Sequence, residues 1–287
     1  KRSEVMRISV VITTFNRPDY LKLSLQSAID QLYKAFEIII IDDNSTADYT
    51  EVLRSFNEND IQYFKREVSG GANVARNFGV SIANGDVVAF LDDDDVWLND
   101  YLEKHAEQYS TGADAVLSGF KHLNNERVVR VNADEIVTKK SLVKGNTYCG
   151  MSGFSCRRDL LLSNNFDEAL SNGQDWDMFV RLFQKGVEFR NIPKPLFLYR
   201  FQTPDGIGSK IRQMRPEDVN KRLRSAFKHK EFLGNYYYND RVAQQCLYSL
   251  KARSNKFNWV LQSIKKAGVM ATLRFFCNRV INAFHKS

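Results

Sequence analysis

The sequence has few of the features that mark secreted, metal-binding or membrane-spanning proteins. Its 287 residues include only four cysteines, which form neither a CxxC pair nor a zinc-ligand spacing. This usage fits reduced thiols in a cytosolic protein. No apolar run reaches the roughly 20 residues that a spanning helix needs, and no apolar signal segment follows the basic N-terminus. We therefore expect neither a signal peptide nor a transmembrane helix.

Both standard nucleotide-binding fingerprints are also absent, because the sequence contains neither GxGxxG nor a Walker loop. The segment Ser69-Gly70-Gly71, followed by Arg76, comes nearest to a phosphate-binding loop with a cation one helical turn later. A Gly-Gly pair most often marks only a turn. Taken alone, this segment is weak support for a phosphate site.

Acidic residues are missing from the end of the chain, where none follows Asp240. Residues 217–287 carry 14 Lys and Arg against 4 Asp and Glu, whereas residues 1–216 carry 27 against 30. The formal net charge of +7 conceals this asymmetry. Such a basic tail points to an anionic partner: membrane head groups, nucleic acid or a phosphorylated substrate.

The remaining composition, 43% hydrophobic and 26% charged, is that of a globular protein with one large domain or a domain and an appendage. In the first hundred residues, apolar β-rich runs alternate with helical patterns, which predicts a parallel sheet. The predicted strands are residues 8–12, 37–41, 61–64 and 86–91, and the predicted helices begin at Pro18, Asn73 and about Leu98.

The chain between residues 113 and 200 mixes both patterns. Strand-like runs at 115–117, 128–131 and 195–199 alternate with helical patterns at 158–162 and 175–185. Turn-forming residues at 203–208 predict a loop. We place the domain boundary just after it, so that residues 1–216 form one domain and residues 217–287 a basic helical extension.

Polar clusters follow three of the predicted strands. Residues 13–17 follow the first strand, residues 42–45 the second, and four consecutive aspartates at 92–95 the fourth. In open α/β sheets, ligands bind at the carboxyl ends of the strands. We therefore expect these clusters to converge on one crevice.

Each cluster has a structural interpretation beside the functional one. The four aspartates could hold a hard divalent cation, or form a solvated turn in which Asp95 or Asn99 caps the next helix. Asp43 lies in ordinary turn material, although a carboxylate there can also bind a ribose or a base. Asp175, at a helix start, fits a cap or dipole partner, or alternatively a general base.

Taken in order, five segments resemble the family 2 glycosyltransferases of GT-A fold. These segments are residues 13–17, 41–45, 70–77, 90–97 and 174–177. The resemblance covers about residues 6–203. It implies an α/β, Rossmann-like, mostly parallel sheet flanked by helices, with the C-terminal helices as an extension.

The resemblance also implies how a nucleotide-sugar would be bound. Thr13, Phe15 and Arg17 would line the pocket for the nucleotide base. Asp43 would bind the base, typically uracil, and Arg76 would lie near the base and the diphosphate.

The remaining implied roles fall on the acidic residues. The aspartates at 92–94 look like the family's DxD element, with Asp92 as its first residue, Asp93 toward the ribose and Asp94 on Mn²⁺ or Mg²⁺. Asp175 matches the Asp that acts as catalytic base in this family. The segments at 150–153 and 165–168 match walls of the pocket.

The sequence departs from the family pattern at two places. Gln174 stands where the family usually has a Glu before the catalytic Asp. The family often has a His shortly after a Tyr-Arg pair, as a metal or phosphate contact, whereas this chain reads Tyr199-Arg200-Phe201-Gln202. Gln202 is therefore only a candidate for the third metal ligand.

The resemblance implies an inverting, metal-dependent hexosyltransferase. It would move a sugar from a UDP-hexose to a hydroxyl of a lipid-linked saccharide in cell-surface polysaccharide synthesis, and would form a β linkage. The enzyme would be cytoplasmic and peripheral on the inner face of the cytoplasmic membrane.

The basic tail is compatible with that location. Between Phe257 and Phe284, apolar residues recur every three to four positions with Lys and Arg interspersed, which predicts an amphipathic helix. Such a helix can lie on an anionic membrane surface, or pack its apolar face on the catalytic domain or on a partner subunit.

Three other functions fit parts of the sequence. A nucleic-acid-binding protein is disfavoured because the chain has no zinc spacing and no ribonucleoprotein-type motif, and its clusters at strand ends are acidic. A sugar-phosphate nucleotidyltransferase would need a Gly-rich basic loop after the first strand, where residues 13–17 contain no Gly. An inactive nucleotide-sugar-binding module remains open because of Gln174 and the missing His.

Overall fold

The computed structural model describes residues 6–56, 61–201 and 206–284. Its contacts divide the chain into two units, which are described separately below. The N-terminal unit comprises residues 1–139, 146–169 and 174–201, and the C-terminal unit comprises residues 140–145, 170–173 and 202–287. The domain boundary at residue 216 stays a prediction.

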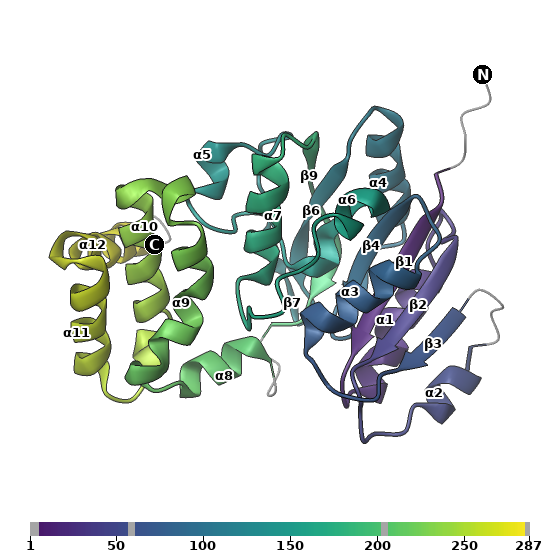
Figure 1. The fold of residues 1–287 in the computed structure, drawn as a ribbon, viewed down its shortest axis with the longest axis horizontal. Helices are drawn as coiled ribbons and strands as arrows, with labels where there is room; N and C mark the ends of the chain where they lie inside the picture. The colour runs from purple at the N-terminus through teal and green to yellow at the C-terminus, as the bar shows by residue number, and fades with distance from the viewer. Residues whose placement is uncertain (1–5, 57–60, 202–205, 285–287) are drawn as a thin grey trace. The chain divides into compact units, whose positions relative to one another are not determined.

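The N-terminal unit is built on a mixed sheet with the strand order β3-β2-β1-β4-β8-β6-β9-β5, in which β7 pairs with β6 (Figure 1). Its first four strands are parallel, as the alternating pattern predicts. They are β1 (Ile8–Thr14), β2 (Glu37–Asp42), β3 (Ile61–Lys65) and β4 (Val87–Asp92). The apolar residues of β1 and β4 are almost completely buried, which explains their continuous hydrophobic runs.

The second half of the sheet is mixed in direction. Strand β8 (Phe154–Arg157) runs antiparallel to both β4 and β6 (Ala115–His122), so β6 and β4 point the same way. Strand β9 (Phe189–Tyr199) is parallel to β6. The remaining strands, β5 (Val96–Trp97) and β7 (Asn125–Arg130), pair antiparallel with β9 and β6. The carboxyl ends of β1, β4, β6 and β9 therefore lie at the same edge of the sheet.

Helices cover the sheet. They are α1 (Pro18–Ile29), α2 (Thr50–Arg54), α3 (Ala72–Ile82), α4 (Tyr101–Ser110), α6 (Arg158–Leu162) and α7 (Gln174–Gln184). The short helix α5 (Lys139–Leu142) begins at the last residue of a segment of this unit, and its other residues belong to the C-terminal unit. Helix α3 lies close against β1 because Gly79 has no side chain: a Cβ there would lie 2.5 Å from Cγ1 of Val11. Figure 1 shows α3 and α6 side by side in front of the strands.

The C-terminal unit is helical, as the sequence from Glu217 predicts. Its helices are α8 (Ile207–Gln213), α9 (Val219–Lys228), α10 (Lys230–Leu247), α11 (Lys256–Ala267) and α12 (Val269–Phe284). They enclose a separate core that includes Leu223, Val242, Leu247 and Trp259.

Two predictions in this unit need correction. Residues 203–205 of the predicted loop lie outside the described residues, but α8 begins at Ile207, directly after Gly206 as its N-cap. The single amphipathic helix predicted between Phe257 and Phe284 is wrong. The chain breaks at Gly268, whose φ of 84° is a left-handed conformation that ends α11 before α12 begins.

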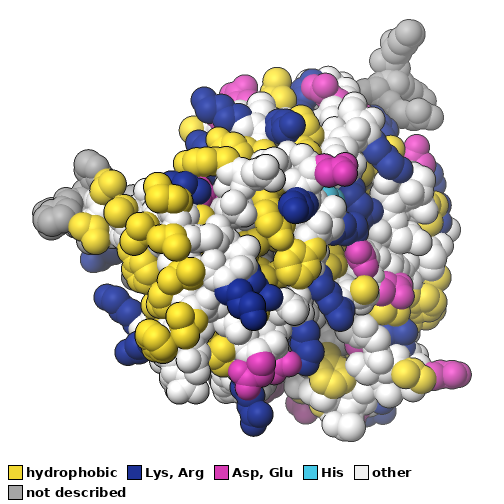
Figure 2. Space-filling model, turned by 60° about the vertical axis from the view of Figure 1, so that its left-hand side comes forward, with side chains coloured by type: hydrophobic (Ala, Val, Ile, Leu, Met, Phe, Trp, Pro, Cys, Tyr) yellow, Lys and Arg dark blue, Asp and Glu magenta, His cyan; other side chains and the backbone are white. Residues whose placement is uncertain are grey.

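The two resulting helices leave many apolar side chains exposed. Phe257 is 73% exposed and Met270 68%, whereas Trp259 and Ala267 on the opposite side of α11 face the core. The apolar surface of α11 and α12 consists of Phe257, Leu261, Ile264, Val269, Met270, Leu273, Phe276, Val280 and Ile281. Figure 2 shows hydrophobic side chains gathered on the molecular surface with Lys and Arg beside them. Within the described residues, no helix combines the length and apolar character needed to cross a membrane.

Candidate active site

The four aspartates form a tight turn at the end of β4. Asp92 is the last residue of the strand and lies opposite Thr13 of β1 in the parallel register. The backbone N–H of Asp95 donates to the carbonyl of Asp92 at 3.1 Å. We call Asp92, Asp93, Asp94 and Asp95 the acidic cluster. As predicted, it shares the sheet edge with the polar residues that follow β1.

Two arginines that the sequence analysis assigned to nucleotide binding contact this cluster. Arg76, which is buried on α3, donates to Asp92 at 2.7 Å. One atom, Nη1 of Arg17, lies 3.1 Å from Asp93 and 3.2 Å from Asp94. Asp93 also accepts from the hydroxyl of Thr14 at 2.8 Å. The structure therefore brings the predicted base pocket and the predicted DxD element together.

The cluster has strongly perturbed acidities. Burial raises the pKa of Asp94 to about 7, and the charges of Asp92 and Asp93 add to this shift while Arg17 opposes it. Burial likewise raises the pKa of Asp93, although Arg17 and Thr14 partly compensate. Crowded carboxylates of this kind gain from a nearby cation, which favours their charged form.

Asp95 has a structural role that the sequence analysis did not identify. Its buried carboxylate accepts from Ser152 Oγ at 2.6 Å and from the backbone N–H of Arg200 at 2.9 Å. Ser152 Oγ in turn accepts from the backbone N–H of Asp92 at 3.0 Å. Arg200 Nε donates to the carbonyl of Asp94 at 3.0 Å. These bonds hold the acidic turn in place.

The interpretation of this turn as a capped helix start is wrong. Helix α4 begins at Tyr101, its N-cap is Asp100, and no side-chain hydrogen bond caps it. Ser152 belongs to the segment 150–153 that the resemblance placed at the pocket wall. The resemblance also places Arg200 in the Tyr-Arg pair, but only the fold reveals the hydrogen bonds of Ser152 and Arg200 to Asp95.

Asp43 organises the loop that leads into α3. Its carboxylate accepts from Ser69 Oγ at 2.8 Å and from the backbone N–H of Gly71 at 2.7 Å, and it pairs with Arg66. Burial opposes the charged form, but the hydrogen bonds from Gly70, Ser69 and Gly71 lower the pKa of Asp43 below its usual value. Its contact with a base stays a prediction.

The loop after β1 forms the rim of the same edge. Thr13 is partly buried and the ring of Phe15 is 48% exposed. Asn16 has a left-handed φ of 56°, and its side chain accepts from the backbone N–H groups of Thr46 at 2.8 Å and Ala47 at 3.1 Å. This bond ties the loops after β1 and β2 to each other. Phe15 therefore presents a flat apolar surface on an ordered rim.

Asp175 lies in the first turn of α7. Its Oδ2 accepts from Nδ2 of Asn146 at 2.6 Å, and its Oδ1 accepts from the backbone N–H of Trp176 at 2.7 Å. Asn146 Nδ2 also donates to the carbonyl of Cys149 at 2.5 Å, which fixes the amide. The sequence gives no signal for Asn146, an isolated polar residue in an irregular segment.

The charge of Asp175 and that of the acidic cluster act on the same residue. Burial raises the pKa of Tyr199 far above its usual value, and Asp95, Asp94, Asp92 and Asp175 each add to the shift. The structure therefore brings the predicted base and the predicted DxD element within electrostatic range of one side chain. Gln202, the candidate third metal ligand, lies outside the described residues.

Oxygen donors of a divalent-ion site are available at this edge. Among the residues that the structure describes, no group of three His, Cys, Asp or Glu side chains is arranged to hold a metal ion. Asp92 and Asp94 nevertheless keep partly exposed carboxylates, with 31% and 19% of their side chains accessible. Magnesium-type ions commonly use one or two carboxylates and complete their shell with water and substrate phosphates. The donor set fits such an ion.

Comparisons with known proteins agree with this geometry. The chain is 24% identical over 251 residues to WfaP of Escherichia coli, a UDP-Glc:α-D-GlcNAc-diphosphoundecaprenol β-1,3-glucosyltransferase, and the match covers 86% of this chain and 98% of WfaP. Its fold is similar to that of Staphylococcus aureus TarS 1–349 in complex with UDP-GlcNAc, with a TM-score of 0.69 at 20% identity over 90% of this chain and 79% of TarS 1–349.

A second solved structure shows the same fold. The mannosyltransferase PcManGT from Pyrobaculum calidifontis, in complex with GDP-Man and Mn²⁺, has a TM-score of 0.62 at 15% identity and covers 97% of this chain and 81% of its own. These likenesses confirm the predicted GT-A type α/β fold. The model of glycosyl transferase family 2 matches residues 9–161, more than half of the chain. The chain therefore belongs to glycosyl transferase family 2.

Proposed function

We propose that this chain transfers a hexosyl group from a UDP-hexose to a hydroxyl of a lipid-linked saccharide during synthesis of a cell-surface polysaccharide. An α-linked donor would give a β-linked product. The similarity to WfaP, a glucosyltransferase with a UDP-glucose donor, a diphosphoundecaprenol acceptor and a β-1,3 linkage, supports this choice. The observation that carries the proposal is the acidic cluster at the end of β4, which the buried Arg76 contacts at 2.7 Å and Arg17 at 3.1 and 3.2 Å.

The donor would be bound at the edge formed by β1, β2 and β4. Thr13, Phe15 and Arg17 would contact the base, and Asp43 would accept from its imide. Arg76 would approach the diphosphate, because its Nη2 lies 2.7 Å from Asp92 of the acidic cluster. A cation at this position favours the negative charge that develops on the leaving group.

The carboxylates of Asp92 and Asp94 would hold Mn²⁺ or Mg²⁺, and Asp93 would face the ribose. When bound, such an ion supplies electrostatic stabilisation of the departing diphosphate. Arg17 neutralises part of the charge on Asp93 and Asp94, as its contacts of 3.1 and 3.2 Å indicate. Asp95 keeps the turn in shape through Ser152 and Arg200.

Asp175 would take the proton from the acceptor hydroxyl as that oxygen attacks the anomeric carbon. The bond to the UDP oxygen breaks on the opposite side, so the configuration inverts. Asn146 orients the carboxylate through its 2.6 Å hydrogen bond. A positioned general base of this kind accelerates a reaction by about 10²–10⁴-fold.

The variant Asp175→Asn tests the proposal. It keeps the size of the side chain but removes the basic oxygen, so we expect turnover of UDP-hexose with a lipid-linked acceptor to fall by about 10²–10⁴-fold. The variant should bind UDP as the wild type does in calorimetric titrations, both with Mn²⁺ and with a chelator.

Asp159→Asn is a matched control. Asp159 lies in the first turn of α6 and its carboxylate also accepts from the next backbone N–H, at 2.8 Å. This variant should keep full activity. Near-normal turnover of Asp175→Asn would refute the base assignment, and metal-dependent UDP binding by an inactive wild-type protein would favour a binding module.

We further propose that the apolar surface of α11 and α12 lies on the inner face of the cytoplasmic membrane. Its exposed residues include Phe257, Met270 and Leu273. No acidic residue follows Asp240, whereas nine Lys and Arg do. Basic helices with an exposed apolar face bind anionic lipid surfaces through both properties.

A further inference from the structure

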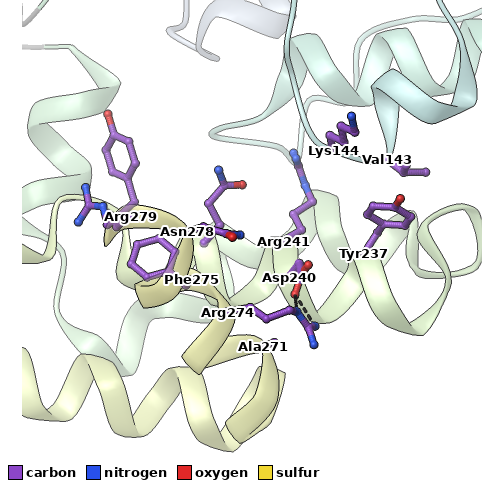
Figure 3. Close-up of a pocket in the computed structure, with 12 residues that line it drawn as sticks. Val143, Lys144, Tyr237, Asp240, Arg241, Ala271, Arg274, Phe275, Asn278 and Arg279 are labelled. Carbon is purple, nitrogen blue, oxygen red and sulfur yellow. Dashed lines mark hydrogen bonds and ion pairs between the residues drawn. The ribbon is translucent and has the colours of Figure 1, made fainter. Parts of the chain in front are cut away.

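The C-terminal unit contains a cavity of about 420 Å³ that the proposed transfer reaction does not use. Helices α10 and α12 form most of its wall, and residues 143–144 and Tyr248 complete it (Figure 3). All its lining residues belong to the C-terminal unit. Its volume lies in the range of small-molecule sites.

The lining of this cavity is basic. It contains Lys144, Arg241, Arg274 and Arg279 but only one carboxylate, Asp240, which gives a net charge of +3. Arg274 Nε donates to Asp240 at 2.8 Å, the interaction drawn as a dashed line in Figure 3. Asp240 is therefore already neutralised within the wall. A concave surface with one sign of charge attracts ions of the opposite sign.

Arg241 is held in place by close packing. It is only 8% exposed. A Cβ on Gly145 would lie 3.0 Å from Arg241 Nη1, and Gly145 has a φ of 108°, which a side chain would disfavour. Gly145 thus lets the chain pass directly against the guanidinium. Arg241 therefore contributes a fixed positive charge to the wall.

A second buried cation lies behind the wall. Arg222 is 7% exposed, and its guanidinium carbon lies 4.8 Å from the ring centroid of Tyr248, which lines the cavity. Its Nε and Nη1 have no hydrogen-bond partner among the residues described. Burial lowers the pKa of Arg222 to about 10, and the charge of Arg253 contributes. Buried positive charge of this kind is stabilised by a neighbouring anion.

The cavity is also partly apolar. Tyr237, Tyr248, Phe275 and Ala271 line it between the cations. The guanidinium of Arg279 lies 5.2 Å from the ring centroid of Phe275. A wall that alternates cations with rings suits an anionic group bonded to an organic chain better than a free inorganic ion.

We propose that this cavity binds the diphosphate ester that joins the acceptor saccharide to its lipid. Arginine and lysine donors bind phosphate oxygens, arginine with two parallel hydrogen bonds. The rings would contact the first carbons of the lipid. The identity of the ester rests on the proposed function, whereas the affinity of the cavity for a prenyl diphosphate does not.

Calorimetric titration with farnesyl diphosphate tests this site. Saturating UDP occupies the donor pocket, so that the titration reports on binding elsewhere. The double variant Lys144→Gln, Arg279→Gln removes two exposed cations from the wall. We expect wild-type protein to bind farnesyl diphosphate, and the double variant to bind it at least about tenfold more weakly.

Lys251→Gln, Lys265→Gln is the matched control, because both lysines are exposed in the same unit and neither lines the cavity. It should bind within twofold of wild type. Equal losses in both double variants, or no binding by wild-type protein, would overturn the proposal. Equally tight binding of inorganic diphosphate would overturn the assignment to an ester.

Two further titrations separate this site from the proposed transfer reaction. Farnesol, which lacks the diphosphate, should not bind; binding as tight as that of its diphosphate would overturn the proposal. UDP should bind all variants equally. Failure of the wild-type protein to bind UDP would count against the proposed function. The farnesyl diphosphate titration would still decide whether the cavity binds a prenyl diphosphate.

Discussion

Asn146 helps to set the orientation of Asp175. Its amide donates to both Asp175 Oδ2 and the carbonyl of Cys149. We expect Asn146→Ala to lower kcat by about 10–100-fold, because a hydrogen bond to a charged group is worth about 1.5–3 kcal/mol. The Kd for UDP should not change. Steady-state kinetics with calorimetry checks this, and a loss confined to UDP affinity would contradict the positioning role.

His105 gives the fold a pH dependence. It is fully buried, Nδ1 lies 2.7 Å from Ser155 Oγ, and burial lowers its pKa to about 3. In the unfolded chain the His105 ring binds a proton near pH 6.5, whereas in the folded protein it stays neutral down to about pH 3. The contribution of His105 to the free energy of unfolding is therefore complete above pH 6.5 and is lost as the pH falls toward 3.

We expect the free energy of unfolding to fall by about 2 kcal/mol more between pH 7 and pH 5 in the wild type than in His105→Asn. Asn cannot take up a proton, so only the wild type responds through this position. Urea unfolding of both proteins at the two pH values measures the difference. An identical drop in both would show that His105 does not titrate as inferred.

At the scale of elements, the contact of α3 with β1 is the most sensitive to added volume. A Cβ at Gly79 would lie 2.5 Å from Val11 Cγ1. Gly79→Ala should therefore destabilise the protein by about 1–3 kcal/mol in urea unfolding, despite the better helix propensity of Ala. The double variant with Val11→Ala should lose less than the two single variants added together. Strict additivity would contradict this close contact.

Strands β1, β2 and β4 could be predicted because each is an apolar run bounded by turn residues, and β3 because its Ile61, Tyr63 and Phe64 are typical strand residues. Strands β5 and β8 could not. β5 has only two residues, and β8 is defined by its pairing with β4 and β6, which lie far away in the sequence. The break at Gly268 was also missed, because the apolar period continues across it.

The candidate site also contains residues that the sequence predicts and residues that it does not. Residues at the ends of strands, such as Asp92, could be placed at one edge because parallel strands align their carboxyl ends. The positioning roles of Asn146, Ser152 and Arg200 could not be predicted, because these residues act through hydrogen bonds to residues distant in sequence. No local pattern encodes such contacts.

At the scale of the molecule, the apolar surface of α11 and α12 predicts lipid binding. Leu261→Gln, Leu273→Gln should weaken binding to phosphatidylglycerol vesicles by roughly tenfold, because each substitution removes an exposed apolar side chain. Leu23→Gln is the control, since Leu23 is 51% exposed on α1 while Leu273 is 53% exposed. Vesicle flotation measures binding. Equal losses in the control, or none in the double variant, would contradict a membrane role for this surface.

The C-terminal unit is assembled from three separate segments of the chain, and this affects how it folds during synthesis. Two of the segments, residues 140–145 and 170–173, lie in the sequence between segments of the N-terminal unit. A ribosome synthesises them before any of residues 202–287, and at about 5–20 residues per second they wait several seconds for the rest of their unit. The C-terminal helices are thus not a detachable tail. Truncating the gene before α8 would leave two internal segments without the partners with which they fold.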